Sequence, residues 1–183
     1  MVSNGPERLF KRYEGNPILT KFMWPYPVNA VFNPAAIRID GETLLMVRVE
    51  DLCCFSHLTV ARNTDGKNDW RIDATPTLKA NPKFGEKEWG IEDPRIVWLE
   101  ENNAYAITYV SFHENGPEVS LIFTEDFKHF QYGGVLLPPE NKDGTLFPKK
   151  VGGRYVLVHR PIVRGEKHIW VVFSHDLKYW GYN

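Results

Sequence analysis

The stretch EDPRIVWLEENNAYAITYVSF, residues 92–112, shows a pattern that occurs three times in the chain. An X-Pro pair is followed by a short apolar run, a polar tip and a second run in which apolar and polar residues alternate. The other copies are FNPAAIRIDGETLLMVRVE at residues 32–50 and LFPKKVGGRYVLVHRP at residues 146–161. Turn residues between two such runs are typical of a β-hairpin. The pattern therefore predicts three hairpins of similar construction.

The prolines indicate where each hairpin begins. Proline has no N–H to give to a strand ladder, so it is tolerated at the first residue of a strand. Pro34, Pro94 and Pro148 are 60 and 54 residues apart. We expect them to mark three equivalent strand starts.

A second element follows each hairpin, with the sequences LTVARNTDGKNDW, VSLIFTEDFKHF and IWVVFSHDLKYW. Each is an apolar strand, an Asp-containing turn and an aromatic residue, which is Trp70, Phe130 or Trp180. A unit of about four strands repeated at this spacing predicts an all-β fold, the β-propeller. No stretch shows a convincing helical period of 3.6 residues. Residues 1–183 are expected to form a single propeller domain of about three blades, truncated at the C-terminus because propellers carry four to eight.

Composition excludes several classes of partner. A net charge of −1 and a pI of about 6.6 give no electrostatic reason to bind nucleic acid or an anionic membrane. No apolar run approaches the roughly 20 residues of a membrane span, so a cytoplasmic location is expected. The adjacent Cys53 and Cys54 are expected to be reduced thiols. The six histidines lack ligand spacing, so no metal site is predicted.

Polar residues stand beside each X-Pro pair, where an innermost propeller strand would meet the mouth of the central channel. Asn33, Asp93 and Lys150 are therefore expected to converge on one axis. Each also has a simpler interpretation, because Asn or Asp before Pro often forms a turn and a lysine pair is often solvated. Arg48 is harder to explain in this way, since a lone charge inside an apolar strand is costly unless it is paired.

The ordered set NAVFNPAAI, VRVEDLCCFSHLTVARN, GIEDPRI, PPENKD, LFPKK and VHRP resembles the β-mannoside phosphorylases of glycoside hydrolase family 130, from about residue 16 to the end. The resemblance implies a five-bladed propeller that cleaves β-1,4-mannosides with inorganic phosphate and inversion, giving α-mannose 1-phosphate. It implies a β-mannoside oligosaccharide and phosphate as partners, with phosphate as co-substrate and no cofactor. A homo-oligomer is left open.

The same resemblance assigns roles to individual residues. Asp93 is expected to be the proton donor, acting through a hydroxyl of the bound mannose, and Asn33 and Arg48 are expected to contact that mannose. The phosphate side is expected to be lined by four residues: Lys150, Asn141, His159 and Arg160. The residues CCF, at positions 53–55, depart from the family pattern at the rim of the sugar site.

General chemistry favours the same activity. An inverting hydrolase needs a second carboxylate to activate water, whereas phosphate is already an anionic nucleophile and needs cations to hold it. One carboxylate facing several cations therefore favours phosphorolysis. Three alternatives remain open: a truncated carbohydrate-binding propeller without turnover, a β-mannoside hydrolase, and a different five-bladed glycosidase that uses Asp51 or Asp143 as a further carboxylate.

Overall fold

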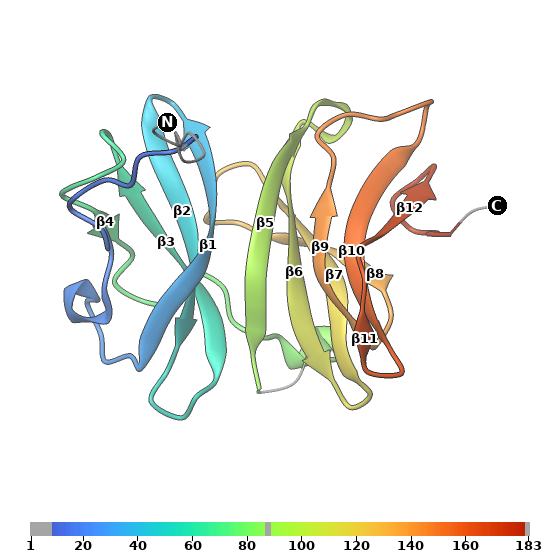
Figure 1. Cartoon of the computed structure of the whole chain (residues 1–183), viewed down its shortest axis with the longest axis horizontal. Helices are drawn as coiled ribbons and strands as arrows, with labels where there is room; N and C mark the ends of the chain where they lie inside the picture. The colour runs from blue at the N-terminus through green and yellow to red at the C-terminus, as the bar shows by residue number, and fades with distance from the viewer. Residues whose placement is uncertain (1–8, 87–88, 182–183) are drawn as a thin grey trace, which may run out of the picture.

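The computed structural model describes residues 9–86 and 89–181 and contains three antiparallel β-sheets (Figure 1). The first sheet consists of β1 (Ala30–Ile39), β2 (Glu42–Glu50), β3 (Ser56–Asn63) and β4 (Arg71–Ile72). The second consists of β5 (Ile91–Leu99), β6 (Ala104–His113), β7 (Gly116–Thr124) and β8 (Gln131–Leu137). The third consists of β9 (Asn141–Leu146), β10 (Tyr155–Val163), β11 (Glu166–Lys167) and β12 (Trp170–Ser174). The described helices are three short 3₁₀ turns: η1 (Lys21–Met23), η2 (Pro82–Phe84) and η3 (Glu100–Asn102).

The sheets follow one another in space in chain order, as Figure 1 shows. Strands of the first two sheets pair in the simple order β1-β2-β3-β4 and β5-β6-β7-β8. The first strand of each sheet also lies beside the first strand of the next, since β5 contacts both β1 and β9. This radial arrangement of four-stranded units around neighbouring first strands confirms the β-propeller prediction.

Apolar side chains between the sheets form the core. Met46 and Leu58 of the first sheet pack with Ile91 and Ile107 of the second. A separate cluster joins the second sheet to the third, and Leu157 is fully buried there. Burying aliphatic side chains stabilises the fold by about 1.5–3 kcal/mol each. These contacts fix how the first strands converge.

The first strand of each sheet contains a β-bulge built on a polar residue with positive φ. These residues are Asn33 at 43°, Asp93 at 49° and Asp143 at 57°, and the strand register shifts at each of them. Asn and Asp adopt this left-handed conformation more readily than other side chains do. The three structurally equivalent positions are therefore Asn33, Asp93 and Asp143.

The prediction that Pro148 starts the third inner strand is wrong. β9 spans Asn141–Leu146, and Pro148 lies in the connection between β9 and β10. Gly144 takes the position that Pro34 and Pro94 occupy in the other sheets. A Cβ at Gly144 would collide with the Val119 side chain of β7, so a bulkier residue does not fit. The Gly-Gly tip at residues 152–153 does lie between β9 and β10, as expected.

The second repeated element is a turn closed by an aspartate. Asp65, Asp126 and Asp176 each accept hydrogen bonds from the backbone N–H groups two and three residues later. The aromatic residue follows in each copy, and the indole N–H groups of Trp70 and Trp180 donate to carbonyls of their own turns. The structure thus confirms the two markers of this second element, the Asp-containing turn and the aromatic residue that follows it.

The third sheet has a more open outer side than the other two. β3 and β7 are almost wholly buried, whereas Trp170 and Val171 of β12 are each 52% exposed. Both cysteines are free and exposed in the turn between β2 and β3. Within the described ranges, no helix is long and apolar enough to cross a membrane, and no group of His, Cys, Asp or Glu is placed to hold a metal ion.

Candidate active site

The bulge of β5 places the Asp93 carboxylate at the centre of a polar cluster. Its Oδ1 accepts hydrogen bonds from Asn33 Nδ2 and from Arg48 Nη1, each at 3.0 Å. The side chains of Asp93 and Arg48 are only 12% and 14% exposed. The structure therefore brings together the predicted proton donor and both predicted mannose contacts, from two different sheets.

Arg48 uses its whole guanidinium group. Besides its bond to Asp93, it donates from Nη2 to Glu92 Oε1 at 2.6 Å and from Nε to Ser56 Oγ at 3.0 Å. Its guanidinium carbon lies 4.5 Å from the centre of the Phe32 ring. A buried charge is tolerated when it is both paired and hydrogen-bonded. This pairing explains how an arginine fits inside the apolar strand β2.

Arg95 supports the backbone of the bulge. Its Nη1 donates to the carbonyl oxygens of Asp93 at 3.1 Å and Pro94 at 2.9 Å. It therefore does not form a direct pair with the Asp93 carboxylate. A residue held at positive φ is strained and persists when its surroundings fix it, and these two bonds help to do so.

The surroundings of Asp93 favour its ionised form. Burial alone would raise the pKa of the carboxyl, but the hydrogen bonds from Asn33 and Arg48 and the charges of Arg48 and Arg95 outweigh it. The net result is a pKa below the ordinary value of 3.8. Asp93 is therefore a carboxylate at neutral pH when no substrate is bound.

Lys142 is a member of this cluster that the sequence did not identify. Its Nζ lies 3.4 Å from Glu92 Oε2 and 5.2 Å from the centre of the Phe112 ring. Glu92 thus joins Arg48 of the first sheet to Lys142 of the third. Lys142 directly precedes the bulge residue Asp143, as Glu92 precedes Asp93, so recognising Asp143 as the bulge would have identified it.

Three of the four predicted phosphate-side residues lie close to Lys142 on the third sheet. Asn141 Oδ1 is 2.7 Å from His159 Nδ1, so Nδ1 carries the hydrogen, and His159 Nε2 is buried without a partner among the described residues. Burial lowers the pKa of His159 and keeps it neutral at pH 7. Arg160 pairs opposite Lys142 in the ladder and donates from Nε to Asp143 Oδ2 at 2.7 Å.

Lys150 lies elsewhere. Its Nζ is 2.6 Å from Glu101 Oε2, which also accepts a hydrogen bond from the Tyr155 hydroxyl. Glu101 lies two residues beyond the last residue of β5, whereas Asp93 lies near the first residue of that strand. About 20 Å of strand therefore separates Asp93 from the end near Glu101. The structure does not bring Lys150 to Asp93, because Lys150 follows β9 instead of starting it.

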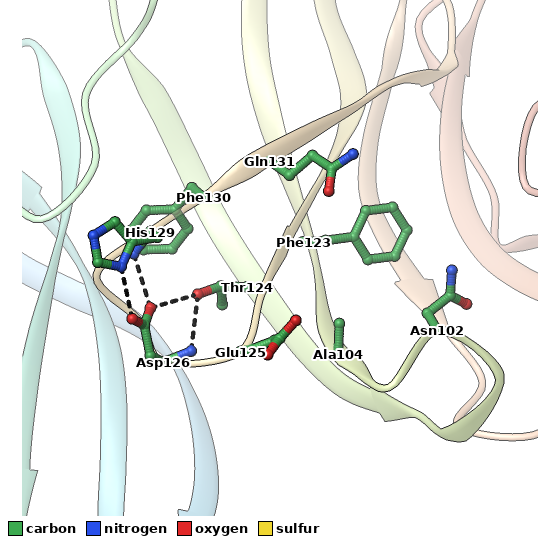
Figure 2. A pocket seen from close by; sticks show the side chains of 9 residues that line it. All are labelled: Asn102, Ala104, Phe123, Thr124, Glu125, Asp126, His129, Phe130 and Gln131. Atoms are coloured by element: carbon green, nitrogen blue, oxygen red, sulfur yellow. Dashed lines mark hydrogen bonds and ion pairs between the residues drawn. The ribbon is translucent and has the colours of Figure 1, made fainter.

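A cavity of about 540 Å³ lies away from this cluster, between the start of β6 and the turn that joins β7 to β8 (Figure 2). One of its two acidic side chains, Asp126, is bonded within its own turn, to Thr124 and His129. Equivalent turns at Asp65 and Asp176 have the same backbone bonds. A feature present in every repeat is structural, so we do not place the active site there.

Comparison with known proteins identifies the family of the chain. The family described as beta-1,4-mannooligosaccharide phosphorylase, glycoside hydrolase family 130, matches residues 7–183. The 1,2-beta-oligomannan phosphorylase of Thermoanaerobacter sp. is 33% identical over 181 residues, 93% of this chain and 58% of the relative. The beta-1,4-mannooligosaccharide phosphorylase of Ruminococcus albus is 30% identical over 180 residues, 93% of this chain and 52% of the relative.

A solved structure of beta-1,2-mannobiose phosphorylase from Listeria innocua, in complex with beta-1,2-mannobiose, superposes with a TM-score of 0.82 at 26% identity. The match covers 93% of this chain and 64% of that one. The chain spans about half the length of the curated relatives it matches. On the family match over nearly its whole length, the chain belongs to glycoside hydrolase family 130.

Proposed function

We propose that this chain carries the catalytic centre of a phosphorylase that cleaves β-mannosides with inorganic phosphate. The supporting observation is the state of the carboxylates around Asp93. Glu92 is paired with both Arg48 and Lys142, and Asp143 is paired with Arg160. A hydrolase needs a free second carboxylate to activate water, and neither of these is free.

In this proposal Asp93 is the acid. A phosphate oxygen forms a bond to C1 of the mannose, the bond from C1 to the glycosidic oxygen breaks, and that oxygen gains the proton held by Asp93. The proton passes directly or through a mannose hydroxyl. Because Asp93 is ionised in the free site, substrate hydroxyls must replace Asn33 and Arg48 as its partners, which raises its pKa and lets it carry the proton.

In this proposal Lys142 takes the phosphate-binding role that the family resemblance assigned to Lys150. Its ammonium pairs with Glu92, the neighbour of Asp93 in β5, and Arg160 supplies a fork-shaped donor from the neighbouring strand. Asn141 and His159 form the wall behind them and hold each other in place. The two cations, on neighbouring strands of the third sheet, suit an incoming phosphate dianion.

We propose β-1,4-mannosides as substrates, cleaved with inversion. The family description and the name of the Ruminococcus albus relative support this linkage. The names of the Listeria innocua and Thermoanaerobacter relatives specify β-1,2-linked substrates, so the β-1,2 linkage is the competing assignment.

The test is incubation with β-1,4-mannobiose or β-1,2-mannobiose, with and without phosphate, followed by phosphorus and proton NMR. We expect α-mannose 1-phosphate from the β-1,4 substrate only when phosphate is present. Preferential cleavage of β-1,2-mannobiose would reverse the linkage. Free mannose formed equally without phosphate would instead identify a hydrolase, and the β-anomer of the product would exclude inversion.

A carbohydrate-binding propeller without turnover is the second candidate. It is favoured by the exposed face of β12, where Trp170 and Val171 are each 52% exposed. Mannobiose binding measured by calorimetry, with no product under any of the conditions above, would establish it. Light scattering in the same buffer tests whether chains associate.

A further inference from the structure

The strand that leads into each Asp-containing turn carries an equivalent side chain three residues before the aspartate. These side chains are Arg62 in β3, Phe123 in β7 and Phe173 in β12. Each pairs with a residue of the adjacent strand, and the side chain two residues before that partner lies diagonally opposite, within reach across the ladder. The diagonal residues are Glu42, Ala104 and Arg154. The three sheets can therefore be compared at the same two positions.

In the first and third sheets the diagonal side chain occupies this place. Arg71, which pairs with Arg62 in the ladder, donates a hydrogen bond to Glu42 Oε1 at 2.5 Å. In the third sheet the guanidinium carbon of Arg154 lies 4.5 Å from the centre of the Phe173 ring. Side chains of the protein itself therefore fill the equivalent place in both sheets.

The second sheet leaves this place open. The methyl group of Ala104 cannot cover the Phe123 ring as Arg154 covers Phe173, and the cavity of about 540 Å³ opens here (Figure 2). Phe123 is half-buried, and a Cβ at Gly133 would come within 2.9 Å of its ring, so the glycine gives the ring its room. Ligand pockets in proteins typically have volumes of about 300–1,000 Å³. An alanine in place of Glu or Arg thus accounts for a cavity large enough for a ligand.

Three polar side chains at the cavity have no hydrogen-bond or ion-pair partner in the part of the chain that the structure describes. They are Asn102, Glu125 and Gln131, and all three are exposed. Figure 2 shows Asn102 and Gln131 on either side of the Phe123 ring. An amide both donates and accepts hydrogen bonds, and a carboxylate accepts them. The hydroxyl groups of a ring that stacks on Phe123 can use all three side chains.

The charges at the cavity disfavour an anionic ligand. Glu125 and Asp126 both line it, and the histidine of the lining, His129, is paired with Asp126 at 2.7 Å. A phosphate would meet these carboxylates, whereas an uncharged sugar can donate hydrogen bonds to them. The combination of an aromatic face, two amides and acidic side chains therefore suits a neutral, polyhydroxylated ring.

The cavity is separate from the candidate active site. Asn102 and Ala104 lie at the tip of the hairpin formed by β5 and β6, whereas Asp93 lies near the other end of β5, about 20 Å of strand away. A mannobiose bound in the cavity therefore does not reach Asp93.

We propose that this cavity is a second, non-catalytic site that binds a neutral sugar residue of an oligosaccharide, with Phe123 as its stacking surface. The choice of a mannoside as the probe rests on the proposed function, whereas the preference for a neutral sugar follows from the lining of the cavity. Such a site keeps a long substrate near the enzyme between cleavages, because a second contact raises the effective concentration of the chain.

The test is an NMR titration of the full chain, labelled with ¹⁵N, with β-1,4-mannotetraose in phosphate-free buffer, where phosphorolysis cannot proceed. We expect the side-chain amide signals of Asn102 and Gln131 to shift. Ala104→Arg gives the second sheet the side chain that covers the ring in the third, so it should abolish these shifts. Because Ala104 lies at the far end of the hairpin from Asp93, this variant should keep the wild-type rate of mannobiose phosphorolysis.

Phe123→Ala is the second variant and does not depend on fitting a larger side chain. It should weaken binding of mannotetraose at the cavity about 3- to 10-fold, the range for loss of one aromatic contact. Phe173→Ala is the matched control, because Arg154 already covers that ring. It should leave the titration unchanged.

Shifts at Asn33, beside Asp93, without shifts at Asn102 and Gln131 would overturn the inference and leave the proposed function intact. Wild-type shifts that persist in both Ala104→Arg and Phe123→Ala would overturn it as well. Mannose 1-phosphate is the charged probe, and equal shifts of the two amide signals with it would contradict the preference for a neutral ring. Absence of shifts anywhere in the chain would contradict the proposed function too.

Discussion

The two ends of β5 carry the same kind of ion pair in different settings. At the start of the strand, Glu92 pairs with Lys142 at 3.4 Å, and the lysine lies over the Phe112 ring. Past its end, Glu101 pairs with Lys150 at 2.6 Å, and that lysine lies over the Tyr155 ring. Judged by contacts alone, the second pair is the closer one.

Burial and convergence distinguish the two ends. The Glu92 side chain is 11% exposed and binds cations from two other sheets, whereas Glu101 is 53% exposed. A strained bulge presents Asp93 only at the first end. An exposed pair contributes little to stability because solvent screens it, while a buried network orients its members. A lysine–carboxylate pair is therefore a poor marker of a site unless several elements meet there.

The largest expected effect comes from Asp93→Asn. Removing the proton donor should lower the phosphate-dependent rate by about 10²- to 10⁴-fold, with mannobiose binding largely retained. Glu101→Gln, at the other end of the strand, should keep the wild-type rate. Mannose 1-phosphate release measures both. A normal rate for Asp93→Asn would show that Asp93 is not the acid.

Gly90→Ala tests the close approach of the first two sheets at the site. Gly90 has φ of 107° and no room for a Cβ against Ser56. We expect a loss of about 3 kcal/mol in the free energy of unfolding, from combined backbone strain and collision. Gly41→Ala is the control, since Gly41 also has positive φ but faces open space; it should lose about 1–2 kcal/mol. Urea denaturation measures both, and equal losses would show that the contact is unimportant.

Replacing each of the two lysines separately sharpens the comparison between the two ends of β5. Lys142→Met should raise the KM for phosphate about tenfold or more, because a charge-assisted contact to phosphate is lost. Lys150→Met should leave that KM unchanged. Initial rates at varied phosphate concentration provide the measurement. The reverse result would restore Lys150 as the phosphate ligand and place the site elsewhere.

The smallest effect concerns pH. The folded pKa of Asp93 is depressed below 3.8, so its ionisation contributes stability above about pH 4 and loses it as the pH falls towards the folded pKa. The stability difference between wild type and Asp93→Asn should therefore shrink between pH 5 and pH 3. Denaturation curves at these pH values measure it, and a constant difference would mean that Asp93 is not stabilised as a carboxylate.

Much of the site follows from sequence because its residues are marked locally. Arg48 stands out as a charge inside an apolar strand, and Asn33 and Asp93 each precede a proline at a strand start. The repeat predicts that Asn33 and Asp93 meet at one axis, and in the structure hydrogen bonds join both side chains and Arg48 at Asp93.

Lys142 could not be found in this way. The third repeat replaces the bulge proline with Gly144, because β7 packs Val119 against that position. Pro148, seven residues after the first residue of β9, Asn141, then imitates the missing marker. Reading Pro148 as a strand start places Lys150 at the axis, whereas in the structure Lys150 lies after the end of β9.

The sequence by itself determined the strands, their grouping into repeats and the pairing of Asn33, Arg48 and Asp93, since these depend on local turn chemistry and on the cost of burying charge. Only the tertiary structure decided that Lys142 pairs with Glu92 and that Lys150 pairs with Glu101. Both pairs depend on how closely one sheet can pack against the next, which a repeat pattern does not encode.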